Sequence, residues 1–225
     1  MFVLHGNMID RNKKGETRLP TGSLMFNNWQ EEHFGVRHSD QAAGFHLEFE
    51  KNWLKHHGVN LELFEGSQPI ETPQIHLPFA KLYHEFKASD AHSKISIELL
   101  LLQICDVLDT AKRIQTKGIP NWIGRLEEIL HYDNTKLTLH YLSEQLGVHP
   151  VHISRTVPRY FSVSLGEYIR QVKIKRAIPL LLDRNYLLTQ VAYDAGFADQ
   201  SHFNQTFRSY FGISPGKYRK AVQRK

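Results

Sequence analysis

Two mostly polar clusters of side chains carry groups that can hydrogen-bond to the edges of nucleic-acid bases. The later cluster consists of Gln200, Ser201, His202, Asn204 and Gln205. The earlier cluster consists of Val151, His152, Ser154, Arg155 and Arg159. In the major groove, glutamine and asparagine suit adenine N6 and N7, and arginine suits guanine O6 and N7. The residue types therefore predict base recognition, provided that each cluster lies on the outer face of a helix.

Helix start and stop signals frame the later cluster. Thr189 is a candidate N-cap for a short helix, and Gly196 ends that helix because positive φ costs least for glycine. Asp199 is a candidate cap for the next helix, and Gly212 ends it. The core-facing stripe of this second helix consists of Phe203, Phe207, Tyr210 and Phe211. Two helices joined by a short glycine-containing turn predict a helix-turn-helix, whose second helix enters the major groove.

The earlier cluster lies in a second copy of the same pattern. Thr138 is a candidate cap, and Gly147 ends that helix 49 positions before Gly196. Pro150 opens the next helix at its first position. The apolar stripe of this helix consists of Ile153, Val157 and Phe161. This internal repeat predicts two equivalent helix-turn-helix units on one chain.

A long helix is expected to join the two units, and Ser164 and Glu167 form a candidate capping box at its start. This helix carries the cations Arg170, Lys173 and Arg176. These cations either contact phosphates or only solvate the helix, and the sequence leaves both alternatives open. Pro158 is expected to end or kink the second helix of the earlier unit, because proline removes a backbone donor.

Residues 191–219 resemble the C-terminal signature of the AraC/XylS family of transcription regulators. The matching residues are Ala192, Gly196, Phe197, Ser201, Phe203, Phe207, Phe211, Gly212, Ser214, Pro215, Tyr218 and Arg219. The departures are Pro158, Ser162, Pro179 and Gln205, the last of which stands where the family often has arginine. The resemblance implies a transcription regulator that binds an operator in double-stranded DNA. It leaves activation and repression open, and an activator would also contact RNA polymerase.

Charge is unevenly distributed along the chain. The 225 residues are 41% hydrophobic and 23% charged, which is typical of a globular protein. Residues 121–225 contain 15 lysines and arginines against 8 acidic residues, whereas residues 1–120 contain 13 against 15. A basic half beside a slightly acidic half favours nucleic-acid binding by the C-terminal half. The single cysteine, Cys105, fits a reducing cytoplasm, and no apolar run is long enough to span a membrane.

We expect an α+β chain with an N-terminal sensing and dimerisation domain over residues 1–118 and an all-α DNA-binding domain over residues 119–225. The N-terminal elements are expected as strands over 2–4, 23–26, 34–36 and 45–49, helices over 51–57, 78–87 and 94–113, a loop over 59–77 and a linker over 116–120. The stretch from Gly22 to His33 is similar to a motif of cupin barrels. That resemblance implies a partial cupin-like β-barrel that senses a small-molecule effector.

His33 is the one histidine in the stretch that resembles the cupin motif, and a catalytic metal site needs about three protein ligands. We therefore expect no metal, no cofactor and no catalytic residue. The alternative from a different class is a cupin-type enzyme fused to a DNA-binding tail. The helix over 94–113 is apolar around more than one face, which favours a homodimer over packing on its own barrel alone.

Overall fold

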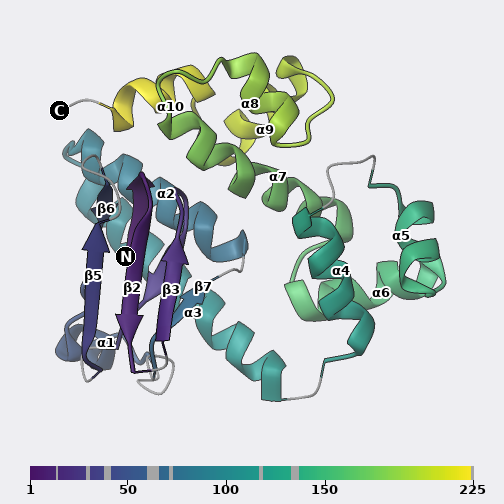
Figure 1. Ribbon diagram of the computed structural model, residues 1–225, viewed down its shortest axis with the longest axis horizontal. Helices are drawn as coiled ribbons and strands as arrows, with labels where there is room; N and C mark the ends of the chain where they lie inside the picture. Colours follow the sequence, from purple (N-terminus) through teal and green to yellow (C-terminus); the bar gives the residue numbers. More distant parts are fainter. Residues whose placement is uncertain are drawn as a thin grey trace.

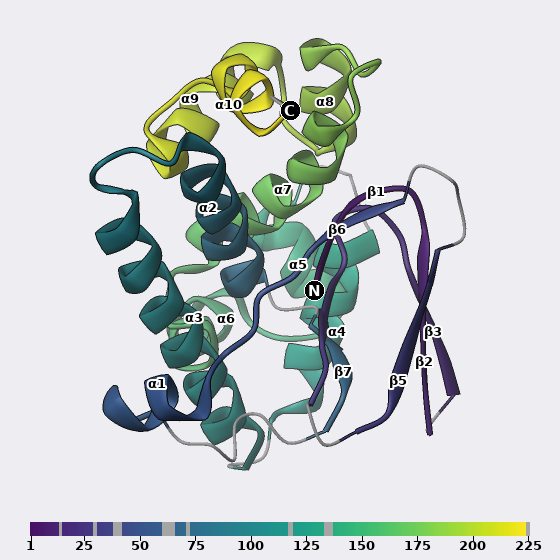
Figure 2. The same cartoon turned by 90° about the vertical axis from the view of Figure 1, so that its left-hand side faces the viewer.

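The structure, a computed structural model, describes residues 1–13, 15–28, 31–37, 42–59, 66–70, 73–116, 119–132 and 137–223. Its strands are β1 (Phe2–His5), β2 (Met8–Asn12), β3 (Gly15–Leu19), β4 (Leu24–Phe26), β5 (His33–Arg37), β6 (Ala43–Phe45) and β7 (Gln68–Ile70). The strands form two antiparallel sheets, ordered β6-β1-β4-β7 and β3-β2-β5 (Figures 1 and 2). Within the described ranges the two sheets do not close into a barrel.

The N-terminal strands differ from the prediction in two places. β2 and β3 pair from Met8–Leu19 to Asn12–Gly15 in a hairpin whose strands the sequence did not predict. The expected strand over 45–49 is wrong beyond Phe45, where β6 ends. Leu47 nevertheless packs against the main core, so its apolar character reflects burial without strand pairing.

The N-terminal helices are α1 (Lys51–His56), α2 (Pro73–Ala88) and α3 (Ser93–Thr116). The prediction of a loop over 59–77 is wrong for its described end, which contains β7 and the first turn of α2. Pro78 lies inside α2 and does not begin it. Figure 2 shows α2 and α3 side by side, and the two helices pack against each other.

The C-terminal helices are α4 (Asn121–Tyr132), α5 (Leu139–Leu146), α6 (Pro150–Phe161), α7 (Leu165–Leu182), α8 (Leu188–Asp194), α9 (Gln200–Phe211) and α10 (Pro215–Val222). We call α5 and α6 the first unit, and α8 and α9 the second unit. The predicted cap Thr138 accepts a hydrogen bond from the Tyr141 amide at 3.1 Å, and Asp199 accepts one from the His202 amide at 2.7 Å. Each of these caps therefore forms as the local sequence predicts.

One expectation about a helix end in these units is wrong, and another is answered in part. Thr189 is not an N-cap, because it lies inside α8 and its hydroxyl donates a hydrogen bond to Gln200 Oε1 at 2.7 Å. Of the two alternatives for Pro158, an end of α6 is excluded because the helix continues to Phe161, and a kink stays a prediction. Ser162 then ends α6 in the left-handed region, with φ of 57°. A non-glycine residue in that region costs about 1–2 kcal/mol, so this end of the first unit is strained where the second unit has Gly212.

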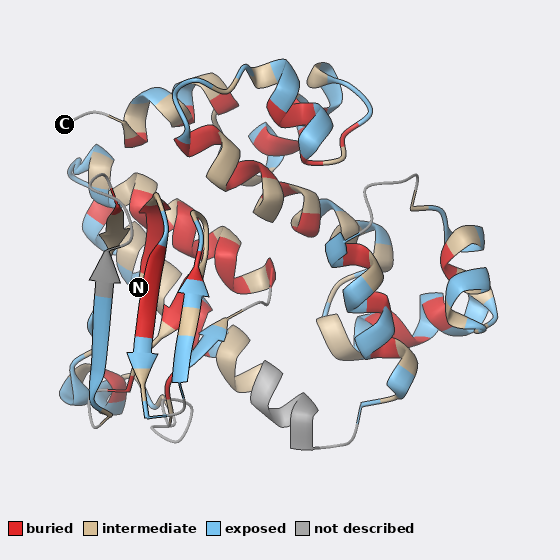
Figure 3. Cartoon of the chain, viewed as in Figure 1, coloured by how far each residue is buried: buried red, intermediate tan, exposed pale blue. Residues whose placement is uncertain are grey.

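Among the described residues the buried apolar side chains form four clusters, and the two with the most buried members, the larger core and the smaller core, organise the C-terminal helices. The smaller core joins α4, the first unit and the start of α7, and its fully buried members include Leu126, Leu142 and Ile153. The larger core joins β1, β4, α2, α3, the end of α7, the second unit and α10. α7 therefore contributes to both cores, and Figure 3 shows buried residues distributed along it. In Figure 1 the first unit lies away from the strands, whereas the second unit and α10 lie above α2.

α2 and α10 form a close contact between the N-terminal and C-terminal parts of the chain. The Tyr218 hydroxyl donates a hydrogen bond to the Ala80 carbonyl at 3.1 Å, and the Tyr83 hydroxyl donates to the Val222 carbonyl at 3.3 Å. The Tyr218 ring also stacks on His84 with centroids 5.6 Å apart. The ranges 1–118 and 119–225 thus share one core, while residues 117 and 118 of the expected linker lie outside the described residues.

Candidate nucleic-acid interface

The outer face of α6 carries the earlier predicted cluster. Its five members, Val151, His152, Ser154, Arg155 and Arg159, are all exposed. The inner face is anchored by Ile153 and Val157, whose side chains are fully buried. Among the described residues, no carboxylate forms an ion pair with Arg155, so its guanidinium is available to an external ligand.

The structure divides the later cluster on α9 into two groups. Ser201, His202 and Gln205 are exposed, whereas Gln200 and Asn204 are half-buried. Gln200 Oε1 already accepts the hydrogen bond from Thr189. The Oδ1 atom of Asn204 is buried, and no described residue donates to it. Gln205 is therefore the α9 amide that is most accessible to a base edge.

Arg208 is an exposed residue of α9 that sequence reasoning did not include in the candidate site. It follows Gln205 by three positions and Ser201 by seven, so all three lie on one face of the helix. The prediction considered only the early residues of the helix. The i, i+4 and i+7 spacing of Ser201, Gln205 and Arg208 is the signal that identifies Arg208 as a further cation on this face.

Three of the four cations of α7, Arg170, Lys173 and Arg176, have partners inside the protein, and their contact with phosphates stays a prediction. Arg170 pairs with Glu167, with Nη2 and Oε2 2.7 Å apart. Lys173 lies 5.7 Å from the Phe197 ring centroid, and burial, together with the nearby Arg176 charge, lowers its pKa. Arg170 and Lys173 therefore each have a contact within the protein in addition to any contact with phosphates.

Arg176 stabilises the end of α4. Its Nη2 donates hydrogen bonds to the Leu130 carbonyl and, at 2.7 Å, to the His131 carbonyl. Carbonyl groups in the last turn of a helix have no partner within the helix, and a nearby arginine can satisfy them. Arg176 thus fixes α4 against α7 beneath the first unit.

His33 lies on β5 and is exposed, with its Nδ1 atom 3.2 Å from the Glu31 carbonyl oxygen. Among the described residues, no group of three or more histidines, cysteines, aspartates or glutamates is placed to hold a metal ion. No described helix combines the length and apolar character needed to cross a membrane.

A family model matches part of the C-terminal half of the chain. Residues 142–221 match a family model described as a helix-turn-helix domain. The chain is 27% identical to the Msm operon regulatory protein of Streptococcus mutans over 103 residues, which cover 45% of this chain and 37% of that protein. It is 34% identical to the multiple antibiotic resistance protein MarA of Escherichia coli over 83 residues, covering 37% of this chain and 65% of MarA. The chain therefore spans less than two thirds of either relative.

Among solved structures, the chain is similar to the C-terminal domain of AraT, a response regulator from Geobacillus stearothermophilus. The sequence identity is 26%, and the match covers 45% of this chain and 85% of that chain, with a TM-score of 0.43.

Proposed function

We propose that the whole chain is a transcription regulator of the AraC/XylS type that binds specific double-stranded DNA in the cytoplasm, because residues 142–221 match a helix-turn-helix domain. The observation that carries this proposal is the pair of recognition helices, α6 and α9, whose exposed faces are polar while their inner faces are buried. Nonspecific binding would require cations on these faces, but not hydroxyl, imidazole and amide groups in rows.

Within this proposal, residues 119–225 form the DNA-binding domain and residues 1–118 the sensing and dimerisation domain. The ten predicted residues of α6 and α9 are the candidate contacts, with Gln205 and Arg155 the best exposed for bidentate base recognition. Arg159 and Arg208 are suited to phosphates. Contact with RNA polymerase would follow if the protein activates transcription.

The first prediction tests Arg155 as a base contact. Arg155→Ala should weaken binding to the preferred DNA site by about 1–3 kcal/mol and relax the preference at one base pair, because a bidentate contact with guanine is lost. Fluorescence anisotropy with DNA selected from a random pool by the purified protein measures both effects. Arg125→Ala is the matched control, since Arg125 is an exposed arginine of α4 that lies outside both recognition helices. Equal effects of the two variants on specific and random DNA would contradict the assignment.

A homodimer is proposed on the outer face of α3. Ile95 and Leu99 are 64% and 63% exposed there, while Ile104 and Cys105 on the inner face are buried. The described strands of the same chain do not cover Ile95 and Leu99, so this apolar strip is available to a second copy.

Sedimentation at tens of micromolar is expected to show a dimer, and Leu99→Lys should shift it to monomer, because a charge would be buried in the apolar contact. The matched control is Phe34→Lys, which changes an apolar residue of similar exposure, 65%, on β5 and away from α3. This control should remain a dimer. A monomeric wild-type protein, or the same loss of the dimer in both variants, would contradict the assignment.

Control by a small-molecule effector is proposed at a cleft between the N-terminal half and the first unit. The cleft has a volume of about 1190 Å³ and is lined from both sides, with Arg18, Thr110, Glu127, Lys175 and Arg176 among its residues. Small-molecule sites typically occupy about 300–1,000 Å³, so the cleft can hold an organic molecule together with water. A bound molecule would contact the elements that support α6, which gives it a route to change DNA binding.

The anionic dye 1-anilinonaphthalene-8-sulfonate is a probe for this cleft, because it combines an aromatic body with a charge that Lys175 and Arg18 can neutralise. Saturable binding by the wild type should be weakened in Thr110→Trp, whose larger side chain occupies the α3 wall of the cleft. The control is Gln103→Trp, at an exposed position of α3 that does not line the cleft. Identical dye titrations for all three proteins would contradict this location.

We propose that the N-terminal half is a partial cupin-like sensor. The support for this proposal is the similarity of the stretch from Gly22 to His33 to a motif of cupin barrels. The alternative of a cupin-type enzyme with a DNA-binding tail is not favoured, because the Msm operon regulatory protein, a relative matched above, is a regulator.

A further inference from the structure

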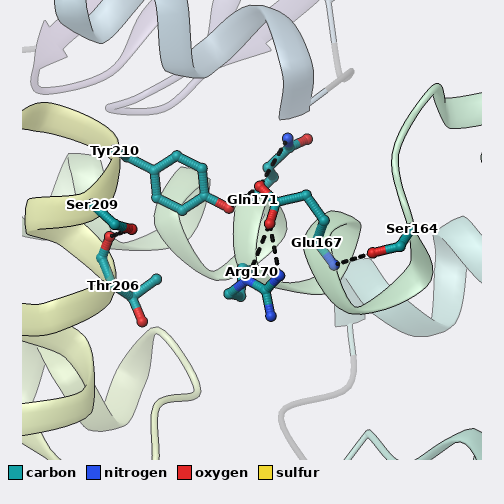
Figure 4. A network of polar contacts seen from close by, with 7 residues as sticks. All are labelled: Ser164, Glu167, Arg170, Gln171, Thr206, Ser209 and Tyr210. Carbon is teal, nitrogen blue, oxygen red and sulfur yellow. Dashed lines mark hydrogen bonds and ion pairs between the residues drawn. The ribbon is translucent and has the colours of Figure 1, made fainter.

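The carboxylate of Glu167 connects α7 to the second recognition helix. The sequence assigned Glu167 to a capping box with Ser164, and half of that motif is present, because Ser164 Oγ accepts a hydrogen bond from the Glu167 amide at 3.3 Å. The Glu167 side chain takes a different role from the one predicted. As Figure 4 shows, its Oε1 atom accepts a hydrogen bond from the hydroxyl of Tyr210, in the last turn of α9.

Neighbouring side chains of α7 hold this carboxylate in place. Arg170 donates two hydrogen bonds to Oε2, from Nε at 3.1 Å and from Nη2 at 2.7 Å. Gln171 Nε2 lies 3.5 Å from Oε1. Burial alone would raise the pKa of Glu167, but the hydrogen bonds from Tyr210 and Arg170 outweigh it and lower that pKa. The carboxylate is therefore ionised at neutral pH, and the Tyr210 hydrogen bond is of the stronger, charge-assisted kind.

The Glu167–Tyr210 bond links the second unit to the part of α7 that belongs to the first unit. Tyr168, the residue next to Glu167, is buried in the smaller core and donates a hydrogen bond to Glu127 of α4 at 3.2 Å. α8 and α10 pack along the other end of α7, in the larger core. Among the described residues, Tyr210 supplies the hydrogen bond between α9 and α7. The bond thus joins the end of one recognition helix to the support of the other.

We propose that Glu167 and Tyr210 are positioning residues that fix the orientation of α9 relative to α6, so that the protein accepts one spacing between the two DNA segments that it contacts. The inference rests on the proposed DNA-binding function. One added base pair between two major-groove segments moves them apart and rotates them by about 34–36°, so a fixed pair of helices cannot follow it. A pair of recognition helices that is free to reorient should lose less affinity when a base pair is inserted.

The first test needs no DNA. Spin labels on Gln145→Cys in α5 and Arg208→Cys in α9 report the distance between the units by pulsed electron–electron double resonance. Cys105 is buried and its pKa is raised by burial to about 11, so the label reacts with the introduced cysteines. Tyr210→Phe, which keeps the ring and removes the hydroxyl, should broaden the distance distribution. Tyr193→Phe is the matched control, because Tyr193 is an exposed tyrosine of α8.

The second test uses DNA selected from a random pool by the purified full-length protein, with zero, one or two base pairs inserted between the protected segments. The wild type should lose affinity by about tenfold or more for one insertion, whereas Tyr210→Phe should lose distinctly less relative to its own affinity for the original site. Tyr193→Phe should follow the wild type. Glu167→Gln, which keeps an acceptor oxygen but no charge, should be intermediate.

Together the two tests distinguish a failure of the proposed DNA-binding function from a failure of the inference about Glu167 and Tyr210. Failure of the wild type to select any DNA would contradict the proposed function, and the spin-label distances would still decide whether the Tyr210 bond fixes α9. Identical spacing profiles and identical distance distributions for the wild type and Tyr210→Phe would overturn the inference while leaving DNA binding intact. If Tyr210→Phe fails to fold in a thermal melt, Glu167→Gln carries the same comparison.

Discussion

Replacing Phe207 by alanine is expected to destabilise the protein by about 3–5 kcal/mol, and to loosen α2 as well as the second unit. Phe207 is fully buried in the larger core, where its ring lies 5.3 Å from that of Tyr218 and 4.3 Å from that of Phe211. Removing such a side chain loses apolar burial and leaves a cavity. Because Tyr218 also contacts α2, the cavity should weaken the contact between the two halves. Urea unfolding measures the free energy, and amide hydrogen exchange locates the loosened helices.

Ile153→Ala is the matched comparison in the smaller core, where Ile153 is likewise fully buried. This variant should lower the free energy of unfolding by about 2–5 kcal/mol and loosen the first unit. Hydrogen exchange in α2 should stay unchanged. Unchanged exchange in α2 for Phe207→Ala would contradict the shared core. Faster exchange in α2 for Ile153→Ala would show instead that the two cores unfold together.

Gly22→Ala is expected to destabilise the protein by about 2–5 kcal/mol through two causes. Gly22 has φ of 87°, a conformation that costs an alanine about 1–2 kcal/mol. A Cβ atom there would also lie 2.9 Å from both Cβ and Cγ of Pro179, in the final turns of α7. Thermal or urea unfolding measures the total.

Two further variants separate these causes. Gly58→Ala should lower the free energy of unfolding by about 1–2 kcal/mol only, because Gly58 has φ of 65° and, apart from its chain neighbours, no atom of the described residues lies within 4 Å of an added Cβ. Pro179→Gly removes both contacted atoms, so it should relieve part of the Gly22→Ala cost, with a coupling free energy of about 0.5–3 kcal/mol in a double-mutant cycle. Strictly additive costs would show that the turn before β4 does not press on α7.

The C-terminal helices could be predicted because their signals are local. Thr138, Gly147, Asp199 and Gly212 each act on the helix next to them in the sequence, and each does so in the structure. Thr189 failed as a cap because α8 begins at Leu188, which places Leu187 at the N-cap position. Gln190, the third residue of the helix, accepts a hydrogen bond from the Leu187 amide at 3.2 Å, and the sequence pattern did not predict this earlier start.

The N-terminal half was harder to predict because strand pairing depends on distant partners. β2 contains Met8, Asp10 and Arg11, which gives it no continuous apolar run, although it is the central strand of its sheet. The candidate site likewise contains features that local spacing predicts and features that depend on distant parts of the chain. The outward position of Arg155 and the i, i+3 pairing of Arg170 with Glu167 follow from helical spacing, whereas the partners of Lys173 and Arg176 come from contacts across the fold.

The shared core has a practical consequence for fragments of this protein. A fragment containing residues 119–225 would lose α2, and the apolar surface around Ile178, Leu181 and Tyr218, which is buried in the whole chain, would face water. Apolar patches of this kind promote aggregation. Residues 121–182 form a more self-contained fragment, because the smaller core draws its members from that range. Such a fragment still carries the apolar surface of the end of α7, so polar replacements at Ile178 and Leu181 would be the first step toward a soluble one.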